Sequence, residues 1–255
     1  MKKILICIMM VSICSFLGAQ EMQEFTRLID VPTAGILQRG EACFPIAIYK
    51  DGGLNFGAGV GIVPRLMFGV EYGGNKIIGD KEPDWLSYPA VFVKYRIFDE
   101  SPDMPGIAIG FDSRGYGAYV EEKPRGQDTV EVNRHEIKSK GFYAVVSRNF
   151  QILGNLGIHG GVNLSTERDD GDKDLNLFLG IDKSINPQIS LLMEYDFAWN
   201  DNSGQAFGDG KGYLNAGLQI YAAQNVLIKF NFRDILNNQF ENVDRSITFQ
   251  YSTHL

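Results

Sequence analysis

Few side chains in this 255-residue chain have the chemistry for catalysis. The three histidines are His135, His159 and His254, and hydrolytic enzymes need a histidine within reach of a serine and an acidic side chain. His159 and Ser165 share one face of a strand-like segment, but six residues of strand separate them by about 20 Å. We therefore predict no catalytic residue. A lipid- or glycan-modifying enzyme that uses His135 or His159 stays open as the less favoured alternative.

Two further patterns imitate ligand sites. Residues 169–174 read Asp-Asp-Gly-Asp-Lys-Asp, which is similar to a calcium loop, but the glutamate that completes an EF-hand loop does not follow. An acidic hairpin loop explains this segment better. Gly57, Gly59 and Gly61 alternate along a strand and open no helix, unlike the glycines that bind a dinucleotide. We therefore predict neither a metal site nor a bound cofactor.

Nine charged residues lie out of phase with the apolar residues of their segments, so we expect them to face an interior. This set, which we call the lumen-facing charge cluster, comprises Glu71, Lys94, Arg96, Asp112, Asp182, Glu194, Asp196, Lys229 and Arg233. An isolated buried charge is costly, so the basic members are expected to pair with acidic members across the interior. The cluster indicates either an ion-paired, filled interior or a polar conduit or binding site.

Apolar residues alternate with small or polar residues along the segments that carry these charges. Leu54, Phe56 and Ala58 are apolar, for example, whereas Asn55 and Gly57 between them are not. A period of two is typical of strands and does not fit a helix. The pattern, regular or less regular, covers residues 42–49, 54–62, 66–72, 91–97, 107–112, 135–147, 156–164, 175–182, 189–198, 214–221, 226–233 and 246–251.

The connections between these segments alternate between short and long, as they do in a barrel that crosses an outer membrane. The long connections are 73–87, 113–134, 166–174, 200–212 and 234–244. We predict an all-β fold, an antiparallel up-and-down transmembrane β-barrel of about 12 strands, with 10 or 14 also open. Aromatic residues near strand ends would form girdles at the lipid headgroups, namely Tyr72, Trp85, Tyr88, Tyr195, Trp199, Tyr213 and Tyr221. A soluble β-sandwich is the alternative.

The N-terminus resembles an export signal. Lys2 and Lys3 precede an apolar run over residues 4–16, and Gly18-Ala19 offers a cleavage site. We therefore predict a signal peptide over residues 1–19, a periplasmic or lumenal N-terminal lead over 20–40 and an outer-membrane barrel over 41–255. A membrane anchor, or a lipoprotein signal at Cys14, is less favoured. Cleavage would leave Cys43 as the single cysteine, which excludes an internal disulfide.

The net charge and the C-terminal residues limit the kinds of partner that we expect. The net charge is −7, and −9 once Lys2 and Lys3 are removed, so a nucleic-acid partner is not expected. Outer-membrane lipid is the expected solvent. Alternating apolar residues continue up to Leu255, which is similar to the C-terminal signal that the barrel-assembly machinery of Gram-negative envelopes reads during insertion. That machinery is therefore a further predicted partner.

Four short motifs resemble those of the YjbH-like outer-membrane proteins. They are residues 30–35 (Asp-Val-Pro-Thr-Ala-Gly), 110–113 (Gly-Phe-Asp-Ser), 160–163 (Gly-Gly-Val-Asn) and 194–196 (Glu-Tyr-Asp). The resemblance covers most of the chain from about residue 30 onward. It implies a β-barrel associated with exopolysaccharide production or export, with polysaccharide or a periplasmic export partner bound, and it offers no catalytic residues. A structural envelope barrel with a filled lumen is the alternative function.

Overall fold

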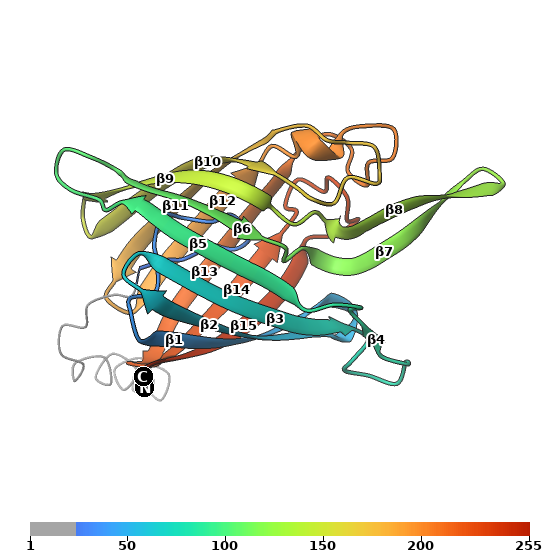
Figure 1. Cartoon of the computed structure of the whole chain (residues 1–255). Coiled ribbons are helices and arrows are strands. Elements are labelled where there is room, and N and C mark those ends of the chain that lie inside the picture. The colour runs from blue at the N-terminus through green and yellow to red at the C-terminus, as the bar shows by residue number, and fades with distance from the viewer. Residues whose placement is uncertain (1–23) are drawn as a thin grey trace, which may run out of the picture.

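The computed structural model describes residues 24–255, and within them twelve antiparallel strands close into a barrel (Figure 1). The strands are β1 (Glu41–Tyr49), β2 (Gly53–Val63), β3 (Leu66–Asn75), β5 (Ala90–Phe98), β6 (Gly106–Asp112), β9 (Gly141–Gln151), β10 (Asn155–Leu164), β11 (Asn176–Asn186), β12 (Ile189–Asp196), β13 (Tyr213–Ala223), β14 (Val226–Arg233) and β15 (Asp244–His254). The predicted fold class is confirmed. The predicted signal peptide, residues 1–19, lies outside the described residues.

Each barrel strand pairs with the barrel strands before and after it in the chain, and the first strand pairs with the last. In β1, Ile46 lies opposite Phe249 of β15 on one side and opposite Phe56 of β2 on the other. Closure leaves no strand of the barrel with an unpaired edge, which is the condition for strands to sit in hydrocarbon. Within the described residues, no helix is long and apolar enough to cross a membrane.

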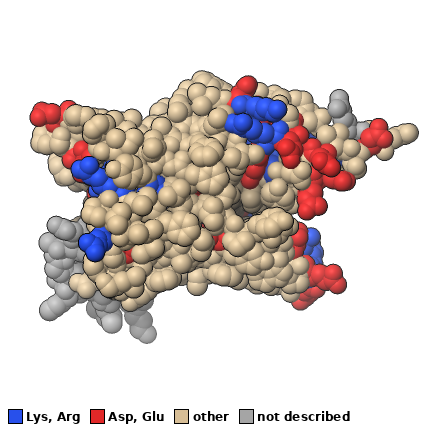
Figure 2. Space-filling view, in the orientation of Figure 1, with Lys and Arg blue, Asp and Glu red and all other residues tan. Residues whose placement is uncertain are grey.

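The period of two places apolar side chains on the outer surface of the barrel and small or polar side chains inside. In β3, Phe68 and Val70 are exposed, whereas Met67 and Gly69 face inward and are buried. A Cβ atom on Gly69 would lie 2.1 Å from the Phe92 ring of β5, so glycine makes room for that ring. Figure 2 shows the result on one face, where charged side chains gather at both ends and few lie across the middle.

The structure differs from the strands predicted from the sequence in one region. The segment 135–147 was expected to be one strand, and the connection 113–134 a loop. Instead, β7 (Tyr116–Arg125) and β8 (Asp128–Ile137) form a separate hairpin that projects from one end of the barrel, and β9 begins only at Gly141 (Figure 1). The break has a local cause, because Gly141 takes a positive φ of 62° and the preceding residues turn inward.

The two ends of the barrel differ in the length of their connections. One end carries short turns, and there the C-terminal residue is tied to the start of β1, because Leu255 N–H donates to Gly40 O at 2.7 Å. The other end, which we call the long-loop end, carries the β7–β8 hairpin, a two-residue strand β4 (Asp84–Trp85) and the short 3-10 helices η1 (Lys50–Gly52) and η2 (Trp199–Asp201).

The predicted aromatic girdle needs two corrections, because Tyr213 and Tyr221 both have the inward parity of β13, and Tyr221 lines an interior space beside Gln219. Tyr72 stacks on Trp85 with ring centroids 5.7 Å apart, at the long-loop end. Tyr213, however, is buried, and its hydroxyl donates to Asp201 Oδ2 at 2.9 Å. Tyr213 has the inward parity of β13, so it completes the interior rather than a girdle.

The chain's own N-terminal residues lie in the lumen and pack against its inner wall. Residues 24–39, which we call the plug segment, run inside the barrel before β1 begins (Figure 1). One apolar cluster joins this segment to the inner wall and consists of Leu28, Ile29, Val31, Ala34, Ala108, Tyr143, Val145, Phe178 and Leu192. A second consists of Ile36, Leu37, Cys43, Met67 and Phe92. Two apolar clusters of the described residues therefore lie where the plug segment meets the wall, and a third, of Ile137, Ala198 and Tyr213, lies at the long-loop end.

Candidate functional site: the lumen

Glu194 of β12 is the acidic anchor of the plug segment. Its carboxylate accepts backbone N–H groups from three consecutive residues, Ile29 at 2.9 Å, Asp30 at 2.8 Å and Val31 at 3.1 Å. Asn215 Nδ2 of the neighbouring strand donates to the same carboxylate at 2.8 Å. Hydrogen bonds to an ionised group are about twice as strong as neutral ones, so this carboxylate holds the backbone of the plug segment in one place.

Two lysines anchor the same segment through its carbonyl groups. Lys94 Nζ donates to the backbone oxygens of Thr33 at 2.8 Å and Gly35 at 3.0 Å, and also to that of Thr26. Lys229 Nζ of β14 donates to Leu28 O at 3.2 Å and Arg27 O at 3.3 Å. Carbonyl groups of a segment without regular secondary structure are thus satisfied by side chains of the wall.

Arg233 of β14 makes a bidentate contact with the plug segment. Its Nε lies 2.8 Å from Asp30 Oδ2 and its Nη2 lies 3.0 Å from Asp30 Oδ1. Arg27 of the plug segment also contacts Asp30, at 3.2 Å, and Arg96 pairs with Glu24 near the start of the segment. The plug segment is therefore tied to β5, β12 and β14, on different sides of the barrel.

The other members of the lumen-facing charge cluster contact loop residues or a histidine. Arg114 lies 2.6 Å from Asp112 and 3.7 Å from Glu71. Lys140 pairs with Asp196. His159 lies 2.8 Å from Asp182. Within residues 24–255, the ion pairs do not join two members of the cluster to each other, because the plug segment and these additional side chains occupy the space between them.

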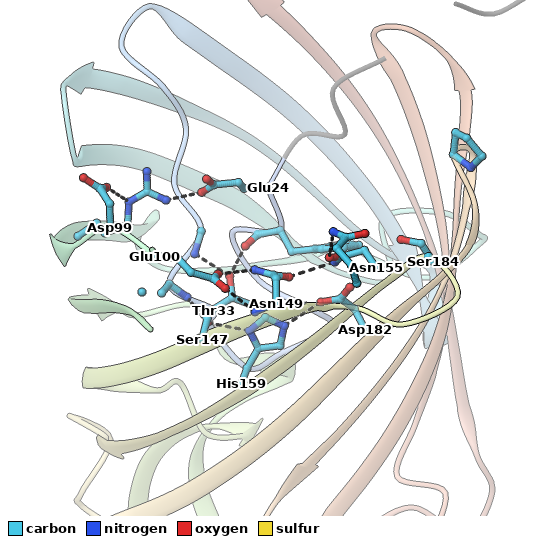
Figure 3. A pocket seen from close by; sticks show the side chains of 18 of the residues that line it. Glu24, Thr33, Asp99, Glu100, Ser147, Asn149, Asn155, His159, Asp182 and Ser184 are labelled. Atoms are coloured by element: carbon cyan, nitrogen blue, oxygen red, sulfur yellow. Dashed lines mark hydrogen bonds and ion pairs between the residues drawn. The ribbon is translucent and has the colours of Figure 1, made fainter. Parts of the chain in front are cut away.

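A cavity of about 650 Å³ lies between the plug segment and the wall, at the end with short turns (Figure 3). Its wall belongs to β5, β6, β9, β10 and β11, and plug residues such as Thr33 and Gly35 face it. A second space of about 110 Å³ lies against β1, β3 and β14, on the other side of the plug segment. The plug segment therefore separates the two open spaces of the lumen from each other.

Sequence reasoning missed a serine beside His159. Ser147 of β9 lies directly opposite His159 of β10 in the register, with Ser147 Oγ 2.7 Å from His159 Nδ1. His159 Nε2 lies 2.8 Å from Asp182 Oδ1 of β11. Ser165, which we had considered, instead accepts Glu167 N–H at 3.1 Å. All three residues of the new group line the large cavity, where Figure 3 shows them together.

Buried charges close the long-loop end. Arg134 of β8 is fully buried and contacts Asp170 at 2.8 Å and Asp201 at 2.5 Å, and Lys138 lies 2.6 Å from the same Asp170. The acidic loop 169–174 thus receives basic side chains and backbone N–H groups. Within residues 24–255, no group of three or more His, Cys, Asp and Glu side chains is arranged to hold a metal ion.

His135 also belongs to this end. Its Nδ1 lies 2.7 Å from Glu167 Oε1, and Glu167 accepts Ser139 N–H at 3.1 Å. Burial alone would raise the pKa of Glu167, but the hydrogen bond and charge of His135 outweigh burial and lower the pKa below its usual 4.5. His135 therefore joins β8 to the loop before β11 and lies apart from the large cavity.

The solved structures that are similar to this chain include outer-membrane porins. The KdgM porin has 9% sequence identity and a TM-score of 0.48, over 84% of this chain and 99% of that chain. Omp33 of Acinetobacter baumannii has 12% identity and a TM-score of 0.43, over 84% and 97%. The NanC porin has 12% identity and a TM-score of 0.43, over 84% and 99%. No protein-family model and no curated protein matches the chain.

Proposed function

We propose that this chain is an integral barrel of the bacterial outer membrane whose lumen is closed by its own plug segment. The observation that carries the proposal is the set of backbone contacts made by Glu194, which accepts three consecutive N–H groups, while Lys94 donates to three carbonyl groups of the same segment. Side chains of the wall are specialised for holding this backbone. The closed state is therefore built into the barrel.

The outer surface supports a location in lipid. Large apolar side chains are exposed on strand after strand, among them Phe44, Phe56, Phe68, Ile109, Val146, Ile158, Leu179, Leu191, Met193, Phe230 and Phe249. Soluble monomers rarely expose contiguous apolar patches larger than a few hundred Å². Burial of apolar surface contributes about 25 cal/mol per Å², so a band of this kind favours hydrocarbon over water. Short turns at one end match the periplasmic side of outer-membrane barrels.

Closure by the plug segment means that solutes cross only when the segment leaves the lumen. Its anchors are polar and reversible, which suits release, whereas its two apolar clusters favour retention. A permanently filled structural barrel differs from a gated channel in one respect only, the population of the released state. Single-channel recording measures that population.

Planar-bilayer recordings of the purified chain test the proposal. We expect the wild type to be silent and a deletion of residues 24–37 to give steady currents, since the deletion empties the lumen. Heat-modifiable migration in a gel shows whether the deletion variant still folds. A second variant, Lys94→Met with Glu194→Gln, retains the segment and should give brief openings. The exposed loop change Glu241→Gln is the matched control. Steady currents from the wild type would overturn the proposal.

The resemblance to YjbH-like proteins adds a second candidate, a role in exopolysaccharide production or export, with polysaccharide or a periplasmic export partner bound. One observation favours it, because residues 30–35, which carry part of that resemblance, belong to the plug segment, and residues 194–196 include its anchor. Surface polysaccharide would then depend on the plug segment. Unchanged polysaccharide in strains that lack the protein, or that carry only the deletion variant, would dismiss this role.

A further inference from the structure

Ser147, His159 and Asp182 form an oriented chain of hydrogen bonds across three neighbouring strands (Figure 3). A carboxylate can only accept, so the contact of 2.8 Å between Asp182 Oδ1 and His159 Nε2 requires the proton on Nε2. Nδ1 of the neutral ring then accepts from Ser147 Oγ–H at 2.7 Å. Nucleophile, base and orienting acid are thus in the order that nucleophilic catalysis requires.

The backbone around this trio is shaped to allow it. Gly157 lies two residues before His159 on the same face of β10, and a Cβ atom there would be 2.1 Å from Asp182 Oδ1 and 2.9 Å from His159 Nε2. Glycine at this position therefore lets the carboxylate reach the ring.

A purely structural role explains the trio poorly. Asp182 is buried, yet its Oδ2 has no hydrogen-bond partner among residues 24–255. A buried polar network that leaves a carboxylate oxygen unsatisfied is less stable than apolar packing of similar volume. Apolar packing is used elsewhere on the inner wall, where Val145 and Phe178 contact the plug segment.

The trio also has space and a suitable donor beside it. All three side chains line the cavity of about 650 Å³, which is large enough for a small organic molecule. Ala34 N–H of the plug segment donates to Ser147 Oγ at 2.8 Å. This contact, together with the one to His159, fixes the position of Ser147 Oγ, so the plug segment helps to position the nucleophile.

We propose that Ser147, His159 and Asp182 form an esterase centre in the lumen. Ser147 Oγ attacks the ester carbonyl carbon as its proton passes to His159 Nδ1. The bond from carbon to the alcohol oxygen then breaks, and the alcohol leaves with that proton. Water gives a proton to His159 and attacks the acyl carbon. The bond from that carbon to Ser147 Oγ then breaks, His159 returns the proton to Oγ, and the carboxylic acid leaves. Asp182 is a positioning residue that stabilises the imidazolium.

The size of the cavity favours short-chain esters as substrates. Its acidic residues are paired: Glu24 and Asp99 with Arg96, Glu100 with Arg148, and Asp182 with His159. Apolar contact for a small acyl group comes from Phe25 and Ala34.

Fluorophosphonate labelling of the purified full chain in detergent tests the proposal, with hydrolysis of p-nitrophenyl acetate as a second readout. We expect one adduct, on Ser147 by peptide mass spectrometry, and a loss of at least about 100-fold in both labelling and hydrolysis in Ser147→Ala and His159→Gln. Ser190→Ala, the same change at a buried serine of β12, should leave both rates unchanged. Absence of an adduct on Ser147 in the folded wild type would overturn the proposal.

Asp182→Asn tests the positioning role. We expect hydrolysis to fall at pH 7 and the loss to narrow as the pH rises, because hydroxide then replaces the base. An unchanged pH profile would assign Asp182 to structure alone. Heat-modifiable migration shows that each variant is folded. Channel recordings of the same variants should remain silent, so failure of the esterase proposal and failure of lumen closure give different results.

Discussion

The two ends of this barrel differ in how tightly their interiors are packed. At the long-loop end, the buried Arg134 is enclosed by Asp170 and Asp201, and the space left beside this group is only about 10 Å³. At the end with short turns, a cavity of about 650 Å³ remains. One end is sealed by buried ion pairs, whereas the other keeps a polar chamber. A ligand of this chamber therefore enters from the side of the short turns, which the proposed orientation places in the periplasm.

The strongest test of the sealed end is Arg134→Met. The change leaves Asp170 and Asp201 buried without their guanidinium partner, which costs about 3–5 kcal/mol. We expect a large drop in the unfolding temperature, followed by heat-modifiable migration, while Lys173→Met on the exposed part of the same loop has little effect. An unchanged unfolding temperature would show that the cap is not what stabilises this end.

The anchor of the plug segment should give the next largest effect. Glu194→Gln replaces a carboxylate that accepts three backbone N–H groups by a neutral amide, and such charged hydrogen bonds contribute about 1.5–3 kcal/mol each. We expect the population of the released state to rise at least about 10-fold, counted as openings in single-channel recordings. Equal opening frequencies in Glu194→Gln and Glu241→Gln would contradict the role of this anchor.

Gly157→Ala distinguishes hydrolysis in the chamber from closure of the lumen by the plug segment. The added methyl group collides with Asp182 and His159, and overpacking of this kind costs about 1–3 kcal/mol. We expect loss of hydrolysis without channel opening. Gly160→Ala on the same strand is the matched control, since its Cβ atom would lie 3.2 Å from Leu179 Cδ2 and 3.9 Å from Phe178 O, away from the trio. Retained hydrolysis in Gly157→Ala would show that Ser147, His159 and Asp182 are not the catalytic group.

Acid should loosen the long-loop end slightly. The pKa of Glu167 is lower in the folded chain than its usual 4.5, so its pairing with His135 contributes stability that is complete above about pH 4.5 and is lost as the pH falls through the lowered pKa. We expect the unfolding temperature of the wild type to fall more steeply than that of Glu167→Gln as the pH falls below about 4.5. Parallel unfolding temperatures of the two proteins across this range would refute the assignment.

The strands could be predicted from the sequence because alternation is a local property. The bounds predicted for β14, Val226–Arg233, are those of the structure. Alternation fails where side chains turn inward without a strand, as at Lys138 and Lys140, which carry the chain from β8 to β9 and contact acidic groups. Alternation of residue types therefore predicts the membrane strands, but it does not predict the polar residues that close the long-loop end.

The site was harder to predict because parity gives a direction but no partner. Lys94 was expected to face an acidic residue, but it contacts carbonyl groups of a segment without a periodic pattern. Ser147 was missed for another reason, since the strand 135–147 was ended too early. The turn at Leu153 and Gly154 fixes the register of β9 and β10, and counting back from it pairs Ser147 with His159.

The thiol of Cys43 offers the most direct test of lumen closure. Cys43 is buried in the cluster that includes Ile36 and Leu37 of the plug segment, and it is the only cysteine of residues 24–255. A maleimide carrying polyethylene glycol should leave Cys43 unmodified in the folded wild type and should modify it rapidly once residues 24–37 are deleted, as measured on the Cys43 peptide by mass spectrometry. Equal rates of modification in the two folded proteins would contradict closure by the plug segment.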